Sequence, residues 1–145
     1  IDVGLLSAAQ IDVNGNLNSS KLTTKSGKTI SLPGSGGAHD ISVLANKVVV
    51  VMPSDPRRFV NNVDFITSPN IPYDNRKGVV GVAMPDGYFS FETGKAVLQK
   101  IYSDRTAEEI RTSLNWDVEI SSTLERINPP SNRILEGANI FLQNN

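Results

Sequence analysis

The sequence predicts an α/β fold with an open mixed or parallel sheet and flanking helices. Residues 48–52 form a continuous run of Val-Val-Val-Val-Met, which is typical of a strand buried on both faces. Residues 38–45 carry apolar side chains at helical spacing, and a glycine-rich turn opens that helix. Residues 79–84 and 88–92 are largely apolar around Pro85-Asp86-Gly87, which is the chemistry of a hairpin turn.

The length and charge of the chain fit a single domain over residues 1–145. A chain of 145 residues can bury one hydrophobic core but is too short for two ordinary ones. Its 14 basic and 15 acidic residues nearly cancel, so no global charge favours nucleic acid or an anionic membrane surface. The longest apolar run is far below the roughly 20 residues that cross a bilayer. We therefore expect neither a nucleic-acid partner nor a membrane partner.

Cysteine and histidine usage excludes several kinds of site. The chain has no cysteine, which excludes disulfides, a thiol nucleophile and thiolate-bound metal, and fits a cytoplasmic location. His39 is its only histidine, so a histidine cluster cannot bind a metal ion. We expect no metal site and no permanently bound cofactor.

The N-terminal half predicts a hairpin, a βαβ unit and one further strand. Asn14-Gly15 is typical of a type I′ turn, which would pair residues 5–11 with residues 17–22. Residues 28–32 form a short alternating strand that, with the helix at 38–45 and the strand at 48–52, makes the βαβ unit. Residues 62–67 predict another strand, and residues 69–77 a surface loop.

The C-terminal part predicts a third antiparallel strand followed by two helices around an extended segment. Residues 95–102 continue the hairpin at 79–92. Thr106 and Glu109 have capping-box spacing, and Ala107, Ile110 and Leu114 then share one helical face. Residues 118–127 are extended, Pro129-Pro130 end them, and Ser131 caps a short last helix.

The clearest chemical signal is the loop at residues 34–40, Gly-Ser-Gly-Gly-Ala-His-Asp. Glycines let a backbone approach a ligand closely, and amides at a helix N-terminus favour an anion such as a phosphate, a carboxylate or an oxyanion. The alternative is a tight connection between strand and helix, in which glycine serves only backbone conformation.

Two nucleotide-binding interpretations of this loop are disfavoured. Asp55 follows at the distance of a ribose-binding acid, but His39 occupies the last glycine or alanine position of the dinucleotide fingerprint, and Pro53 and Pro56 surround Asp55. No Gly-Lys-Ser/Thr follows the glycines, so a P-loop is excluded.

Polar residues near the loop have two open roles each. His39 titrates near neutrality and suits a base or an acceptor, but is equally an ordinary polar residue. Asp40 can contact substrate or bond a backbone amide at the helix start. Arg57-Arg58 can clamp a carboxylate or phosphate, or form a solvated or salt-bridged pair.

Three motifs, in order, resemble one known family. They are residues 7–19 (Ser-Ala-Ala-Gln-Ile-Asp-Val-Asn-Gly-Asn-Leu-Asn-Ser), residues 32–41 (Leu-Pro-Gly-Ser-Gly-Gly-Ala-His-Asp-Ile), and residues 57–60 with 63–69 (Arg-Arg-Phe-Val and Val-Asp-Phe-Ile-Thr-Ser-Pro). Together they resemble the B (beta) subunit of class I coenzyme A transferases of the glutaconate CoA-transferase type. The likeness continues through residues 87–91 and 117–118 and covers the later part of such a protein.

The resemblance implies the CoA-transferase-like (NagB/RpiA-type) fold and an active site shared with an A (alpha) subunit. In that family a glutamate of the beta subunit attacks the acyl-CoA and holds CoA as a glutamyl thioester until an acceptor carboxylate takes it. That glutamate precedes the motif at Gln10. Because Ile1 is not Met and leads straight into a strand-like stretch, we expect the N-terminal part to be missing and this stretch not to complete the reaction alone.

The resemblance also implies roles for individual residues. The backbone of Gly36 and Gly37 matches the family loop that contributes an N–H to the oxyanion hole. Gln10 matches a strand end that can contact the thioester, although a structural glutamine fits as well. The expected substrate-binding residues are Gln10, Gly34, Ser35, Ala38, His39 and Asp40.

Two other functions remain open at this point. Relatives of this fold include hydrolases that open rings in cyclic CoA thioesters without the nucleophilic glutamate, and a non-catalytic structural fragment is a third possibility. Before Arg57 this chain has Pro-Ser-Asp-Pro where relatives often carry a histidine, so acyl specificity does not follow from the glutaconate analogy.

Overall fold

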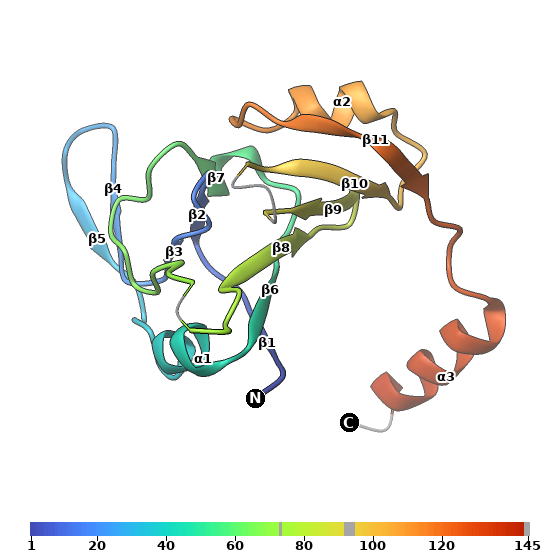
Figure 1. Cartoon of the computed structure of the whole chain (residues 1–145), viewed down its shortest axis with the longest axis horizontal. Coiled ribbons are helices and arrows are strands. Elements are labelled where there is room, and N and C mark those ends of the chain that lie inside the picture. The colour runs from blue at the N-terminus through green and yellow to red at the C-terminus, as the bar shows by residue number, and fades with distance from the viewer. Residues whose placement is uncertain (73, 92–94, 144–145) are drawn as a thin grey trace.

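A six-stranded mixed sheet organises the backbone (Figure 1). The structure is a computed structural model and describes residues 1–72, 74–91 and 95–143. In spatial order the strands are β1 (Val3–Leu6), β6 (Lys47–Val51), β8 (Val79–Ala83), β9 (Gly87–Ser90), β10 (Val97–Ile101) and β11 (Glu119–Arg126). The first three strands are parallel, β9 is antiparallel to both neighbours, and β11 is parallel to β10. The predicted open α/β sheet is confirmed.

Helix α1 (Ala38–Leu44) connects β1 and β6 on one face of the sheet. A Cβ on Gly4 of β1 would lie 2.6 Å from Ile41 Cγ2 and 3.3 Å from Ala45 Cβ, so glycine permits this close packing. The predicted βαβ unit therefore exists, but its first strand is β1. The strand predicted at 28–32 is β5 (Thr29–Ser31), which pairs instead with β4 (Lys21–Thr23) in a separate hairpin.

The burial of β6 differs from the prediction for residues 48–52. Val48 and Val50 are fully buried, whereas Val49 is half-buried and Val51 is 51% exposed. The β-branched run suggested a strand buried on both faces. Among the described residues, β6 is completely covered only on the face that packs toward α1.

The hairpin of β8 and β9 and its extension by β10 are as predicted. Gly81 pairs with Ser90 and Leu98 pairs with Phe89, both antiparallel. Glu92, the last residue of the predicted second strand, lies outside the described residues. Gly81 is required here, because a Cβ at this position would lie 2.2 Å from Tyr88 Oη.

A smaller sheet of β3 (Leu17–Asn18), β2 (Gln10–Asp12) and β7 (Phe59–Val60) lies beside the main sheet (Figure 1). Trp116 joins the two. Its ring makes edge contacts with Phe59 at 5.0 Å and Phe91 at 5.7 Å between centroids, and its Nε1–H donates to Val60 O at 2.8 Å. One buried aromatic side chain therefore sets the distance between the sheets.

Two predictions for this smaller sheet are wrong in detail. The turn after Asp12 is not type I′, because Gly15 has φ +80° but Asn14 does not have positive φ. The Asp12 carboxylate forms the turn instead by accepting the N–H groups of Asn14 and Asn16, each at 3.0 Å. Residues 62–67 form no strand, because Asp64 N–H donates to the Gln10 side chain and not to a neighbouring strand.

The C-terminal elements follow the sequence pattern closely. Helix α2 (Ala107–Thr112) has the predicted capping box, and Ile110 and Leu114 are buried. β11 is the predicted extended segment at 118–127. Helix α3 (Asn132–Gln143) is longer than the short helix predicted and stands apart from the sheet (Figure 1). None of the helices in the described ranges is long and apolar enough to cross a bilayer.

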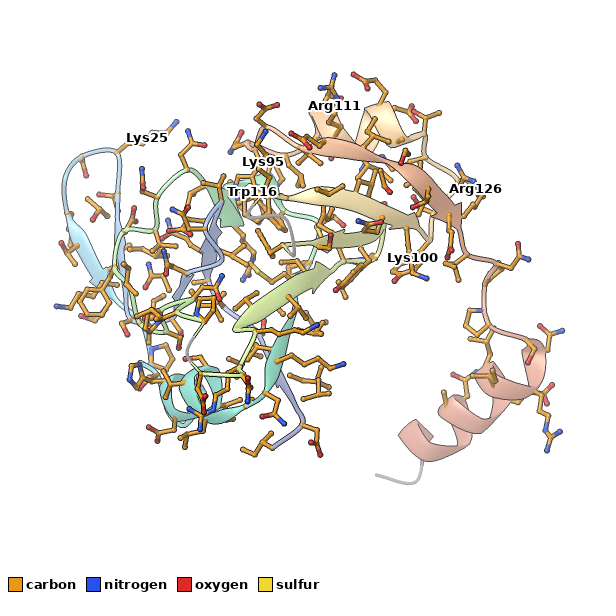
Figure 2. All side chains as sticks on the ribbon, in the orientation of Figure 1. Lys25, Lys95, Lys100, Arg111, Trp116 and Arg126 are labelled. Carbon is orange, nitrogen blue, oxygen red and sulfur yellow. The ribbon has the colours of Figure 1, made fainter. Side chains whose placement is uncertain are left out.

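Charged side chains surround the β11 edge of the main sheet (Figure 2). Lys95 Nζ lies 2.6 Å from Glu119, and Lys100 Nζ lies 2.9 Å from Glu125, so two ion pairs join β11 to the β10 side of the sheet. Exposed ion pairs of this kind contribute little to folding stability.

The capping box gives a first prediction. Thr106 Oγ1 accepts the Glu109 N–H at 3.2 Å, and the Glu109 carboxylate accepts the Thr106 N–H at 2.7 Å. We expect Thr106→Ala to lower the free energy of opening of α2 by about 1 kcal/mol. Amide hydrogen exchange of α2 measures this, with Thr106→Ser as the control that keeps the oxygen. Unchanged protection in Thr106→Ala would contradict it.

The short helix η1 (Pro56–Arg58) gives a second prediction. Hydrogen bonds from the Arg57 side chain and backbone lower the pKa of Asp55 from 3.8 to about 2. The ion pair is therefore complete above pH 3.8 and is lost as the pH falls through about 2. A carboxyl ¹³C NMR titration should show a midpoint near pH 2, and Arg57→Gln should raise it toward 3.8. An ordinary midpoint in the unmodified protein would refute the pairing.

Candidate functional site

Three segments far apart in the sequence meet at a buried pair of amide side chains. Asn18 has no exposed surface, and its Nδ2 donates to Gln10 Oε1 at 2.7 Å and to Lys21 O at 2.6 Å. Gln10 Oε1 also accepts the Asp64 N–H at 3.0 Å. Because an N–H of the backbone can only donate, this bond fixes which end of the Gln10 amide faces inward.

Hydroxyl groups extend this network to residue 67. The Ser19 N–H donates to Thr67 Oγ1 at 2.9 Å, and Thr67 Oγ1 donates to Ser20 Oγ at 2.8 Å. Asn18 Oδ1 accepts the N–H groups of Ser20 and Lys21. The segments at 17–21 and 64–68 are thus held together largely through side chains.

The glycine-rich loop is attached to the same network. Leu32 N–H donates to Ser20 O at 2.8 Å, and Gly34 N–H donates to Ser19 O at 3.0 Å. On the far side of the loop, His39 Nδ1 lies 3.1 Å from Thr67 O. A carbonyl oxygen only accepts, so Nδ1 carries the proton, and Nε2 is the ring nitrogen left for another partner.

Within the loop, two consecutive backbone amides are free. Ala38 N–H donates to Ser35 O at 2.9 Å, and Ser35 Oγ donates to Gly36 O at 3.2 Å. In the described part of the chain, the N–H groups of Gly36 and Gly37 have no acceptor. Both residues are exposed, so these amides are available to a ligand.

The space above the free amides is open. A Cβ built on Gly36 or Gly37 would meet no atom within 4 Å. Gly36 has φ +49°, which disfavours other residues, whereas Gly37 has φ −87°, which any residue adopts. The backbone at Gly37 therefore does not require glycine, and the open space beside it is the remaining feature of the position.

The structure separates the other predicted residues by their freedom. Gly34 and Ala38 use their N–H groups within the protein, as described above. Asp40 lies in the first turn of α1, is exposed, and within the described ranges bonds no backbone amide, contrary to one of its two predicted roles. Helix α1 has only seven residues, so the loop amides and not the helix dipole favour an anion here.

The arginine pair divides into two different environments. Arg57 forms a bidentate ion pair with Asp55, and its side chain is 88% exposed. Arg58 is half-buried and its Nη1 donates to Ala8 O at 3.0 Å. The predicted salt-bridged outcome thus applies to Arg57, and the occupied carboxylate of Asp55 is unsuited to binding a ribose.

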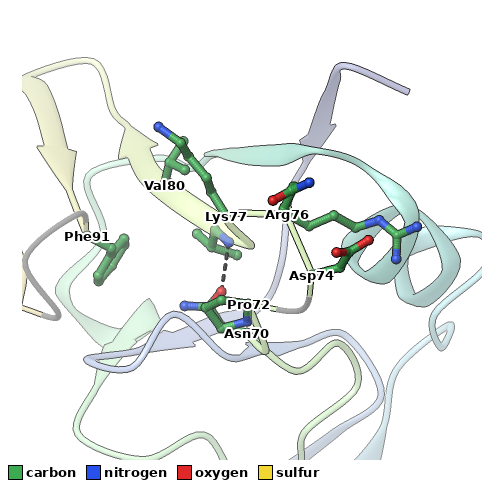
Figure 3. A pocket seen from close by; sticks show the side chains of 9 residues that line it. Asn70, Pro72, Asp74, Arg76, Lys77, Val80 and Phe91 are labelled. Carbon is green, nitrogen blue, oxygen red and sulfur yellow. Dashed lines mark hydrogen bonds between the residues drawn. The ribbon is translucent and has the colours of Figure 1, made fainter.

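A large cavity lies away from the glycine-rich loop. A volume of about 640 Å³ is bounded by the loop at 70–77, the start of β8 and Phe91 (Figure 3). Asn70 Oδ1 accepts the Val79 N–H at 2.7 Å at its edge. Its described lining includes none of the predicted site residues, so its size alone does not indicate the chemistry. Across the described residues no cluster of three His, Cys, Asp or Glu side chains could bind a metal.

Sequence analysis missed Asn18 and Thr67, which position the loop and its neighbours. Both were present in the motifs, but nothing local in the sequence indicates that their partners lie 8 and 48 residues away. The signal that could have found them is polarity inside otherwise strand-like segments.

Comparison with known proteins places this geometry in a family. The profile described as Coenzyme A transferase matches residues 1–83. The beta subunit of 3-oxoadipate CoA-transferase from Pseudomonas knackmussii is 28% identical over 94% of this chain and 56% of its own length. The beta subunit of glutaconate CoA-transferase from Acidaminococcus fermentans is 27% identical over 85% of this chain and 50% of its own length. The chain thus spans about half the length of these relatives.

Solved structures agree on the fold. Glutaconate coenzyme A-transferase from Acidaminococcus fermentans superposes with a TM-score of 0.80 at 24% identity, over 92% of this chain and 55% of that chain. The decarboxylase AibA/AibB superposes with a TM-score of 0.77 at 22% identity, over 94% and 55%. The fold therefore serves more than one reaction, but the sequence relatives do not favour the ring-opening hydrolase. With the profile covering residues 1–83 of 145, the chain belongs to the coenzyme A transferase family.

Proposed function

We propose that this chain is the later portion of a CoA-transferase beta subunit that moves CoA between an acyl-CoA and a carboxylic acid. The observation that carries the proposal is the pair of free amides at Gly36 and Gly37, which face open space in a member of this family. Such amides suit the oxygen that becomes negatively charged when a thioester carbonyl is attacked.

The proposed reaction is double displacement through a carboxylate nucleophile. A glutamate outside this sequence, before Gln10, attacks the thioester carbonyl, and the CoA thiolate leaves to give a mixed anhydride. The thiolate then attacks the glutamyl carbonyl of the anhydride, which releases the first carboxylate and leaves a glutamyl-CoA thioester. The acceptor carboxylate repeats the two steps in reverse, so CoA is substrate and covalent intermediate, and no permanently bound cofactor is needed.

The loop residues have separate roles in this scheme. Gly36 and Gly37 donate N–H groups to the oxyanion, and one such donor is typically worth about 2.7–4 kcal/mol of transition-state energy. Gly34 and Ala38 shape the loop, because their own N–H groups are already bonded. Ser35, His39 and Asp40 supply polar contacts to substrate, with His39 acting through Nε2.

The proposed partner is an alpha subunit of the same enzyme. Both sequence relatives are named as one of two lettered subunits, the second, which supports a two-subunit enzyme for this chain. Since the proposed nucleophile lies outside the sequence, the experiments below use the complete enzyme with both subunits.

Mass spectrometry tests the covalent step. The complete enzyme is mixed with acetyl-CoA, butyryl-CoA or glutaryl-CoA and examined intact and after digestion. We expect a mass increase of one CoA less one water on a single glutamate of the beta subunit, and its loss when a carboxylate acceptor is added. Turnover of a thioester without any adduct would contradict the proposal and favour hydrolysis.

Substitution of Gly37 tests the oxyanion role. Neither the backbone nor a neighbouring atom opposes a Cβ here, so Gly37→Ala and Gly37→Val should fold normally. The added carbons occupy the space of the acyl group, and we expect Gly37→Val to lower kcat about 10²-fold, with a smaller loss in Gly37→Ala.

Gly137→Ala is the matched control, because it adds the same methyl group in open space on α3. Its kcat should equal that of the unmodified enzyme. If Gly37→Val lost stability and activity in the same proportion, the loop would be a structural turn only.

A further inference from the structure

A second cavity lies next to the glycine-rich loop. Its volume is about 360 Å³. The residues lining it are Ala9, Gln10, Leu22, Leu32, Asp55, Arg57 and Arg58. Leu32 precedes Gly34 by two residues, and both are bonded to neighbouring residues, Ser20 and Ser19. The cavity therefore adjoins the segment that carries the free amides.

The register of the smaller sheet places Gln10 and Arg58 together. β2 and β7 are parallel, with Ile11 opposite Phe59. One step earlier along both strands, Gln10 and Arg58 are neighbours on the opposite face. Ile11 and Phe59 are fully buried in the core, so the other face, with Gln10 and Arg58, is the one that lines the cavity.

Both side chains retain unused hydrogen-bond donors. Gln10 Oε1 accepts from Asn18 and Asp64, whereas Gln10 Nε2 has no acceptor within the described ranges. Arg58 is held by one bond from Nη1 to Ala8 O, and it pairs with no described carboxylate. An amide and an anchored guanidinium with free N–H groups are a suitable pair of donors for a carboxylate.

The carboxylate of Asp55, which also lines the cavity, does not compete for these donors. Asp55 is engaged by the Nε, Nη2 and backbone N–H groups of Arg57. The pair of Asp55 and Arg57 is neutral overall, which leaves the charge of Arg58 as the net charge of the described lining. A ligand group with one negative charge is the complement.

The opposite wall of the cavity is apolar. Leu22 and Ile30 pair directly across the β4–β5 hairpin and share one face, and Leu32 continues that face by strand alternation. Leu22 and Leu32 line the cavity, and Ile30 is 45% exposed beside them. Methylene groups of a ligand can pack against this wall between the donors and the loop.

We propose that this cavity binds the far carboxylate of a short dicarboxylic acyl group, with Gln10 Nε2 and Arg58 as donors and Leu22 and Leu32 along the chain. The inference rests on the proposed CoA-transferase function, because the reacting carboxyl group lies at Gly36 and Gly37. Arg58 and Gln10 then determine specificity and do not take part in the chemical steps.

Acceptor discrimination in the complete enzyme tests this. Glutarate and pentanoate have the same number of carbons and differ in the second carboxylate, so kcat/KM is measured for both. We expect glutarate to be preferred about tenfold or more, and Arg58→Met to lower kcat/KM for glutarate by about 10- to 100-fold while changing pentanoate less than about threefold. Arg57→Met is the matched control and should leave both values within about threefold, because Arg57 already pairs with Asp55.

Two further variants keep the test decisive if Arg58→Met fails to fold. Gln10→Glu retains the oxygen that Asn18 and Asp64 bind but places negative charge at the cavity, so it should also lower the value for glutarate selectively. Arg58→Lys keeps the charge without the fork and should lose part of the preference. Equal losses for both acceptors, or no preference in the unmodified enzyme, would overturn the inference.

A binding measurement separates this inference from the proposed function. Glutarate, and not pentanoate, should shift the Gln10 side-chain NH₂ resonance in an NMR titration. If glutarate shifts it but no glutamyl-CoA forms, the binding site stands and the transferase proposal fails. If the glutamyl-CoA adduct forms but glutarate leaves Gln10 unchanged, the transferase stands and the dicarboxylate site is wrong.

Discussion

The hydrogen bond between Asn18 and Gln10 is the interaction on which the arrangement of the site depends. It is buried, and its two amides hold the segments at 8–12, 18–21 and 64–68 in one place. Removing either partner would leave a buried polar group without a bond, which is more costly than the bond itself is favourable. In the proposed site Gln10 combines a structural and a binding role, since its oxygen faces the network and its nitrogen faces the cavity.

The two sheets contribute differently to this site. The main sheet supplies most of the apolar core and contacts the smaller sheet through Trp116, whereas the smaller sheet and the β4–β5 hairpin carry the polar and apolar groups that line the second cavity. The glycine-rich loop connects them, because it leaves the hairpin after Ser31 and enters α1. The proposed substrate contacts thereby lie on short, irregular elements that a rigid sheet supports.

The parts predictable from sequence are those fixed by local chemistry. The helix after Thr106 follows from its own capping box, and the loop at 34–40 follows from its glycines. The segment at 62–67 misled because its apolar residues resemble a strand, yet Phe65 and Ile66 are exposed and Asp64 bonds a distant glutamine. The free donors of Arg58 could not be predicted either, since they depend on which arginine pairs with Asp55. Long-range polar pairing decides both cases, and single-sequence patterns do not encode it.

The charged border of β11 affects how the chain behaves before it finds a partner. β11 is an eight-residue strand at one edge of the sheet, so its outer backbone groups could template another strand. Glu119 and Glu125 on this strand, with Lys95 and Lys100 beside it, would bring like charges together if two copies paired edge to edge in an in-register parallel arrangement. These ion pairs, which add little to stability, thus oppose aggregation of newly made chains through their sheet edges.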